Sequence, residues 1–326
     1  MTPDITVVIP TYQRPDLLMN CLDALSQQQL PSEQFEIIVV DDGNDEATAE
    51  TVTEFARTTG IETRYLAQPQ RRGMAAARNR GWKAARGRII AFTEDDCLPQ
   101  PDWLSNALAI FKRGAQVISG QVRVPIKHRT AHHDRSTAFI DSINFVTTNC
   151  FCLRSIIQRV GGFEEQFDIA WREDSDLQFK LLQLGVTILK CPDVRIIHPI
   201  QQSSWWSSLK EERKQSYDAL LYKRHPELFK QRIPVYRSLV VRYYASVISV
   251  LIGLLALMMG NVFMAGAGFA LWFVLSLSLI INRLTTSGAG ADLKNFSYAV
   301  LTGLATPFLS VYWRLHGAVK YKVLYW

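Results

Sequence analysis

The sequence has few cysteines and lacks the two glycine-rich motifs with which many enzymes bind phosphate. Its 326 residues include five cysteines, an odd number, and no C-x-x-C pair, so neither a disulfide framework nor a zinc site is indicated. No G-x-G-x-x-G follows the first apolar stretch and no G-x-x-x-x-G-K-[ST] occurs, which argues against a dinucleotide-binding or P-loop enzyme. The amino terminus also lacks the basic and apolar regions of a signal peptide, so we expect none, and we expect a reducing, cytosolic setting.

Basic residues are not interleaved with aromatic ones in the first half of the chain, although the formal net charge is +6 and the pI is near 9.1. A nucleic-acid partner is therefore not expected. The basic residues gather instead just before a long apolar segment, as they do on the cytoplasmic side of a membrane span. They are Lys210, Arg213, Lys214, Lys223, Arg224, Lys230, Arg232, Arg237 and Arg242. This distribution indicates that membrane lipid is a partner.

Charged side chains are missing altogether between residues 243 and 282. A helix of this length would extend to about 60 Å, twice the thickness of a hydrocarbon core, so the segment predicts two spans with a turn at Gly260 and Asn261. A buried hairpin of a soluble protein is the alternative, but apolar character on every face favours lipid. A third apolar stretch, residues 296–313, contains Pro307 and is followed by basic residues. We expect a re-entrant or interfacial element there, with three spans as the alternative.

Apolar, β-branched runs alternate with helical patterns through the first hundred residues. Strands are predicted at residues 5–9, 36–40, 63–66 and 88–93, and helices at 15–28, 45–59 and 74–85. This alternation predicts an α/β fold with a mostly parallel sheet and helices on both faces. Further along, the pattern predicts a helix at 101–112 and strands at 116–124, 149–153, 187–190 and 194–197.

Three adjacent carboxylates, Glu94, Asp95 and Asp96, follow the predicted strand at 88–93. Like charges in a row repel one another unless a cation lies among them, and hard oxygen ligands suit Mg²⁺ or Mn²⁺. A solvated acidic turn is the common alternative. The position at the carboxyl end of a buried strand favours a binding site, because open α/β sheets bind ligands at that edge.

A second acidic group, W-R-E-D-S-D, begins the stretch 171–185, which contains a predicted helix that ends at Gly185. Asp174 or Ser175 is expected to cap this helix. Acidic residues are favourable at the positive end of a helix dipole, which accounts for one of Glu173, Asp174 and Asp176 but not for all three.

Six short motifs occur in order across about the first 200 residues. They are V-V-I-P-T-Y (7–12), I-V-V-D-D-G (38–43), G-M-A-A-A-R-N (73–79), T-E-D-D (93–96), G-G-F (161–163) and R-E-D-S-D-L (172–177). In this order they resemble the motifs of family-2 glycosyltransferases with the GT-A fold. The resemblance implies a Rossmann-like mixed sheet flanked by helices and transfer of a sugar from a nucleotide-sugar, with inversion at the anomeric carbon.

The resemblance also implies which residues contact the donor. Thr11 and Asp41 match positions that contact the base and ribose, and Arg78 lies in the segment near the base or diphosphate. Asp95 is expected nearer the sugar or ribose. Asn149 is a candidate contact to the acceptor or the diphosphate, with a buried capping role as the alternative.

The metal ligands and the base follow from the same resemblance. Glu94 replaces the usual first aspartate of the metal motif, and Asp96 is expected to contact Mg²⁺ or Mn²⁺ directly. His198 is a candidate further ligand, although a histidine at the end of a strand is more often structural. Asp174 matches the catalytic base, which would deprotonate the acceptor hydroxyl.

Together these observations predict a membrane-anchored glycosyltransferase. We expect a GT-A domain at residues 1–200, amphipathic interfacial helices at 201–240, and a transmembrane hairpin with a third membrane or re-entrant element at 241–326. The catalytic domain would face the cytoplasm at the inner cell membrane and transfer a sugar, most readily from a UDP-sugar, to a lipid-linked or glycan acceptor. A homo-oligomer is left open.

Two other classes of protein fit parts of the pattern. One is a catalytically inactive GT-A-fold scaffold of a polysaccharide assembly system, which the intact Asp41, Asp96 and Asp174 oppose. The other is a nucleotidyltransferase, which would normally carry a glycine-rich, basic phosphate loop where this chain has P-T-Y-Q-R.

Overall fold

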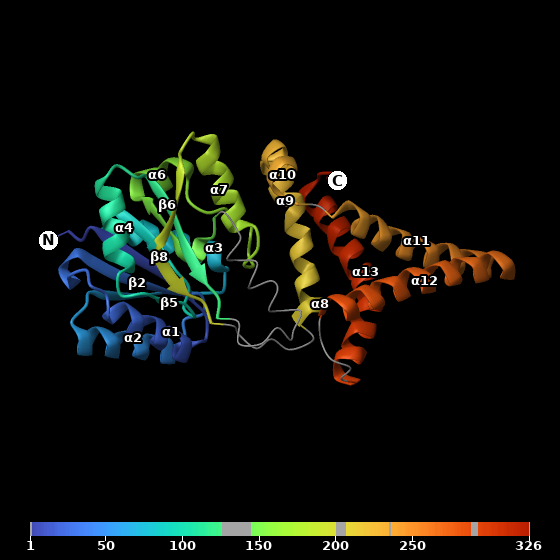
Figure 1. Ribbon diagram of the computed structural model, residues 1–326, viewed down its shortest axis with the longest axis horizontal. Helices are drawn as coiled ribbons and strands as arrows, with labels where there is room; N and C mark the ends of the chain where they lie inside the picture. Colours follow the sequence, from blue (N-terminus) through green and yellow to red (C-terminus); the bar gives the residue numbers. More distant parts are fainter. Residues whose placement is uncertain (1, 126–144, 200–206, 235, 288–292, 326) are drawn as a thin grey trace. The chain divides into compact units, whose positions relative to one another are not determined.

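The computed structural model describes residues 2–125, 145–199, 207–234, 236–287 and 293–325 (Figure 1). The chain divides into two compact units, of which the first comprises residues 1–126 and 136–201 and the second residues 127–135 and 202–326. Part of the predicted interfacial segment, residues 201–206, lies outside the described residues.

In the described part of the first unit, eight strands form one sheet in the order β3-β2-β1-β4-β7-β6-β8-β5 (Figure 1). The strands are β1 (Ile5–Thr11), β2 (Phe35–Asp41), β3 (Thr63–Ala67), β4 (Ile89–Phe92), β5 (Leu98–Pro99), β6 (Val117–Arg123), β7 (Cys150–Leu153) and β8 (Ile188–Ile197). Strands β3, β2, β1 and β4 are parallel, as the alternation with helices predicts. Strand β7 runs antiparallel to β4 and β6, so the sheet is mixed.

Helices cover both faces of this sheet. They are α1 (Pro15–Ser26), α2 (Glu46–Thr59), α3 (Met74–Ala84), α4 (Trp103–Lys112), α6 (Arg154–Val160) and α7 (Glu173–Gln183), with short 3₁₀ turns η1 (Ser32–Gln34) and η2 (Thr147–Asn149). Leu22, Phe55 and Trp103 from α1, α2 and α4 pack in one core, whereas Trp82 and Leu177 from α3 and α7 pack in the other. Both faces of β1, β2 and β4 are buried, which explains their continuous apolar runs.

Two local predictions need correction. The strands expected at 187–190 and 194–197 form the single strand β8, because the register against β6 shifts between Gly120 and Gln121 and the irregularity does not end the pairing. The helix expected to be capped by Asp174 or Ser175 begins earlier, at Glu173. Its flanking residue, Arg172, has the left-handed φ of 73° and supplies no side-chain cap.

The second unit is helical throughout its described elements. These are α8 (Ser207–Glu211), η3 (Glu212–Gln215), α9 (Ser216–Arg224), α10 (Pro226–Arg232), α11 (Arg237–Met258), α12 (Val262–Ser287) and α13 (Leu293–Tyr321). Helices α11 and α12 are joined by the predicted turn, where Gly260 has a φ of 71° and the Asn261 side chain accepts a hydrogen bond from the Met264 amide at 3.0 Å.

Helices α11 and α12 are long and apolar enough to cross a bilayer, with mean hydropathies of 2.0 and 2.1 over an 18-residue window within residues 237–258 and 262–285. Most of their large apolar side chains are exposed, as in Leu251, Leu255 and Phe273. The third apolar stretch forms part of α13, one continuous helix of 29 residues that contains Pro307. Its predicted re-entrant or interfacial placement stays a prediction.

Candidate active site

The predicted donor residues Thr11 and Asp41 lie side by side where β1 and β2 end, because they are partners in the parallel register. The Thr11 hydroxyl donates to Asp95 Oδ2 at 2.7 Å. The Asp41 carboxylate accepts hydrogen bonds from the Gly43 amide at 2.9 Å and the Tyr65 hydroxyl at 2.7 Å. Both side chains are therefore oriented by the protein before any ligand binds.

An arginine that the sequence analysis did not single out covers the acidic turn. Arg14 Nη2 lies 2.5 Å from Asp95 Oδ1, and Nη1 lies 3.4 Å from Asp96 Oδ2. Burial raises the pKa of Asp95 to about 6 against the opposing charge of Arg14. The position of Arg14 just after β1, where other nucleotide-binding folds place a phosphate loop, was the available signal.

A second overlooked side chain, Asp42, organises the loop before α3. Its carboxylate accepts hydrogen bonds from the backbone amides of Arg72 and Gly73 at 2.7 and 2.8 Å and from the Gln68 side chain at 2.7 Å. Gly73 has a φ of 90°, and a Cβ there would lie 2.4 Å from the Asp168 carbonyl oxygen. Asp42 and the glycine together bring the start of α3 to the edge of the site.

His198, at the end of β8, lies against the acidic turn. Its Nε2 atom is 3.6 Å from Asp96 Oδ1 and 3.8 Å from Glu94 Oε2. Potential ligand atoms of Asp96, Cys97 and His198 all lie within 4.8 Å of one another, and His198 Nδ1 is buried without a hydrogen-bond partner among the described residues. The Asp96 oxygen and the His198 nitrogen suit a divalent cation, whereas burial raises the pKa of Cys97 and disfavours the thiolate that would bind one.

Neighbouring charges shift the pKa values of both Glu94 and His198. Burial alone would raise the pKa of Glu94, but the His198 side chain and the Arg78 charge outweigh it and lower that pKa to about 2. Burial alone would lower the pKa of His198, but Glu94 and Asp96 raise it. His198 therefore adds to the positive charge that arginines already supply to the two acids, since Arg78 lies 2.9 Å from Glu94 and Arg14 lies 3.4 Å from Asp96.

Arg78 lies in α3 and is completely buried. Its Nη2 atom donates to Glu94 Oε1 at 2.9 Å and its Nη1 atom to Glu173 Oε1 at 3.1 Å. The guanidinium thus joins the acidic turn after β4 to the start of α7. A contact from Arg78 to the donor stays a prediction, and in this structure both terminal nitrogens already bind carboxylates.

Asp174 follows Glu173 in the first turn of α7 and keeps partial exposure. Its Oδ1 atom accepts a hydrogen bond from the Ser175 amide at 2.7 Å. Burial by the surrounding protein raises the pKa of Asp174, against the lowering effects of that amide and of Arg78. A carboxylate with a raised pKa and access to solvent is suited to accept a proton.

Asn149 is fully buried next to β7, and its amide is engaged on both sides. Trp103 Nε1 donates to its Oδ1 at 2.9 Å, while its Nδ2 donates to the carbonyls of Gln121 and Val194, both at 2.9 Å. This arrangement favours the capping role over a ligand contact.

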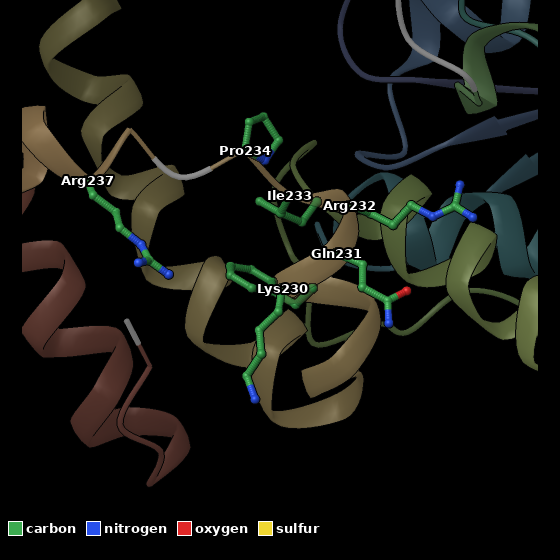
Figure 2. Close-up of a pocket in the computed structure, with 7 residues that line it drawn as sticks. Lys230, Gln231, Arg232, Ile233, Pro234 and Arg237 are labelled. Carbon is green, nitrogen blue, oxygen red and sulfur yellow. The ribbon is translucent and has the colours of Figure 1, made fainter.

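A separate cavity of about 480 Å³ lies in the second unit, between α10 and α11. Figure 2 shows Lys230, Arg232 and Arg237 extending from this segment, with Ile233 and Pro234 between the two helices. None of the predicted catalytic or metal-binding residues lines it. Its basic lining belongs instead to the charged stretch that precedes the first apolar helix.

The chain is similar to known proteins in both sequence and fold. The family model described as Glycosyl transferase family 2 matches residues 6–171, and the model Glycosyl transferase family group 2 matches residues 89–284. Glycosyltransferase AglE of Haloferax volcanii is 26% identical over 211 residues, which cover 60% of this chain and 67% of that protein. Validoxylamine A glucosyltransferase of Streptomyces hygroscopicus subsp. limoneus is 26% identical over 223 residues, which cover 56% of this chain and 49% of that protein.

Among solved structures, the mannosyltransferase PcManGT from Pyrobaculum calidifontis, in complex with GDP-Man and Mn²⁺, has a TM-score of 0.57 at 19% identity and covers 99% of this chain and 88% of its own. This likeness shows the GT-A type of fold. The first family model matches just over half of the chain and includes the ends of β1, β2 and β4, where Thr11, Asp41 and the acidic turn lie. The chain therefore belongs to glycosyl transferase family 2.

Proposed function

We propose that the chain is a membrane-anchored, metal-assisted inverting glycosyltransferase. It takes a sugar from a nucleotide-sugar, with UDP-sugars as the first donor class to test, and transfers it to a lipid-linked or glycan acceptor. The observation that carries the proposal is the joining of two acidic groups by one buried arginine: Arg78 links Glu94, beside Asp96, to Glu173, beside Asp174. The residues proposed to bind the donor and the residue proposed as the base therefore belong to one site.

In this proposal each group has a separate task. Asp174 accepts the proton of the acceptor hydroxyl, which makes that oxygen a better nucleophile. Thr11, Asp41 and Asp95 hold the nucleoside, and Asn149 supports the site from the core. Asp96, with Glu94 and His198, would hold Mg²⁺ or Mn²⁺, which supplies positive charge to the departing diphosphate.

The membrane part of the proposal is supported by the second unit. Two apolar helices of suitable length suggest association with a bilayer, and basic side chains around the cavity of Figure 2 immediately precede the first of them. Under the positive-inside tendency this end of α11 lies in the cytoplasm. We propose a multi-pass protein of the inner cell membrane, organised as the GT-A domain, interfacial helices and membrane region given above.

Metal-dependent nucleotide binding and turnover test the enzyme proposal. The purified full chain in detergent should bind UDP with Mn²⁺, as measured by calorimetry with GDP and dTDP alongside, and Asp96→Ala should abolish that binding. Asp174→Asn should retain binding but lower sugar transfer to a membrane lipid extract by on the order of 10²- to 10⁴-fold. Unchanged transfer by Asp174→Asn would exclude its role as base, and a folded protein that binds no nucleotide would favour the inactive scaffold.

A further inference from the structure

The guanidinium of Arg78 is a fully buried positive charge of the first unit, with 0% of the residue exposed. Besides its contacts to Glu94 and Glu173 at 2.9 and 3.1 Å, it lies 5.6 Å from the centre of the Phe163 ring. Its Nε atom has no hydrogen-bond partner among the described residues. One side chain on α3 therefore contacts three segments that are distant in sequence.

Burial of this arginine needs a reason other than stability. Transfer of a charged group from water into a protein interior costs several kcal/mol, and an ion pair repays that cost only in part. Apolar side chains could join α3, β4 and α7 with less desolvation. What they could not provide is a fixed distance between two carboxylate-bearing segments, since only a planar group with several donors can bind both at once.

The two partners of Arg78 each sit next to a group with a proposed task. Glu94 also accepts a hydrogen bond from the Thr148 hydroxyl at 3.1 Å and belongs to the acidic turn. Glu173 immediately precedes Asp174 at the start of α7. That helix has no side-chain cap at its start, so Arg78 is a principal side-chain contact that holds its first turn.

We propose that Arg78 is a positioning residue, which sets the separation between the acidic turn and the first turn of α7 and thereby holds the Asp174 carboxylate at the donor site. The inference rests on the proposed function, because it takes Asp174 to be the base. It differs from the donor contact predicted for Arg78 from the sequence: the arginine acts through Glu94 and Glu173 and does not touch the substrate.

Lysine is the informative replacement. It keeps the positive charge but has one ammonium group on a flexible stem, which cannot form two directed bonds to carboxylates on either side. Glu173→Gln tests the same link from the other end while it leaves Arg78 in place. Arg64→Lys is the matched control, because Arg64 binds the buried Glu36 at 3.1 Å elsewhere in the same unit.

Hydrogen exchange and kinetics together test the proposal. In Arg78→Lys and Glu173→Gln, amides of residues 176–180 in α7 should exchange at least about tenfold faster than in the wild type. The turnover number should fall on the order of 100-fold, because a displacement of about 1 Å is enough for such a loss. The dissociation constant for UDP with Mn²⁺ should change less than about threefold, and Arg64→Lys should show neither the exchange change nor the turnover loss.

Two results would overturn the positioning role. One is unchanged protection of α7 in both variants. The other is a loss of UDP affinity as large as the loss of turnover, which would make Arg78 a donor contact. If the wild type neither binds a nucleotide nor transfers sugar, the proposed function fails, but exchange in the three variants still decides whether Arg78 holds α7.

Discussion

At the scale of single residues, Asp95 and Asp174 have the same side chain but different hydrogen-bond partners and different exposure. Asp95 is held by Thr11 and Arg14 and is wholly buried. Asp174 keeps partial exposure, with the Ser175 amide as its hydrogen-bond partner. A carboxylate already engaged on both oxygens is suited to hold a ligand in place, whereas one that keeps partial exposure can accept a proton.

The pH dependence of the reaction should report Asp174. A base must be deprotonated, and burial raises the pKa of Asp174 above that of an ordinary aspartate, so kcat/KM should fall on the acidic side at a pH above about 3.9. Below that pKa the rate should drop about tenfold per pH unit. The measurement is kcat/KM against pH at saturating Mn²⁺.

Nucleotide affinity measured over the same pH range is the control for this profile, because protonation of Asp96 or His198 would weaken donor binding as well. A rate that stays constant down to pH 4, in protein that remains folded, would be incompatible with Asp174 as the base.

At the scale of elements, close contact between α11 and α12 depends on small residues. Ser246, Ser249 and Gly253 are buried on α11, and a Cβ added at Gly268 of α12 would lie 2.8 Å from the Ser249 carbonyl oxygen and 2.9 Å from the Gly253 nitrogen. Small residues of this kind let helix backbones approach within a membrane, where apolar side chains have no preference for protein over lipid.

Replacement of Gly268 by leucine should therefore separate the two helices. Overpacking of a close contact costs about 1–3 kcal/mol, and the thermal unfolding midpoint of the detergent-solubilised chain should fall accordingly. Gly266→Leu is a matched control on the same helix, because a Cβ there meets nothing within 4 Å. Equal shifts in the two variants would show that the backbone contact at Gly268 is not what holds the helices together.

At the scale of the whole molecule, the chain combines a unit with two conventional cores and a unit whose long helices expose apolar side chains. Exposed apolar patches of this extent mark contact with another protein or with a membrane. The lengths of α11 and α12 match a hydrocarbon core, which is in keeping with the proposed membrane association.

Labelling of introduced cysteines should determine the orientation. All five native cysteines are buried, so they should react little in the folded protein. In intact spheroplasts a membrane-impermeant maleimide should label Met259→Cys, at the exposed turn between α11 and α12, but should label Lys112→Cys on α4 only after lysis.

Each of the other labelling patterns would contradict part of the proposed membrane topology. Labelling of both variants only after lysis would mean that the hairpin does not cross the membrane. Labelling of Lys112→Cys in intact spheroplasts would place the catalytic unit outside.

The elements of the first unit and the order of its motifs can be predicted from local sequence patterns. Strands β1 to β4 lie within two residues of their predicted bounds, because buried strands and amphipathic helices leave a local hydrophobic period. The apolar hairpin with its turn at Gly260 was equally predictable, since a long run without charged residues and the glycine that interrupts it are both visible in the sequence.

The pairing of side chains, by contrast, depends on the fold. The antiparallel placement of β7 between β4 and β6 and the contacts of Arg14 and Arg78 with acids 81 and 95 positions away have no local signature. The sequence shows that an arginine is present, but its partner depends on which segments the fold brings together. Burial then determines its role, because a guanidinium enclosed by carboxylates is held in place and a solvated one is free to bind a ligand.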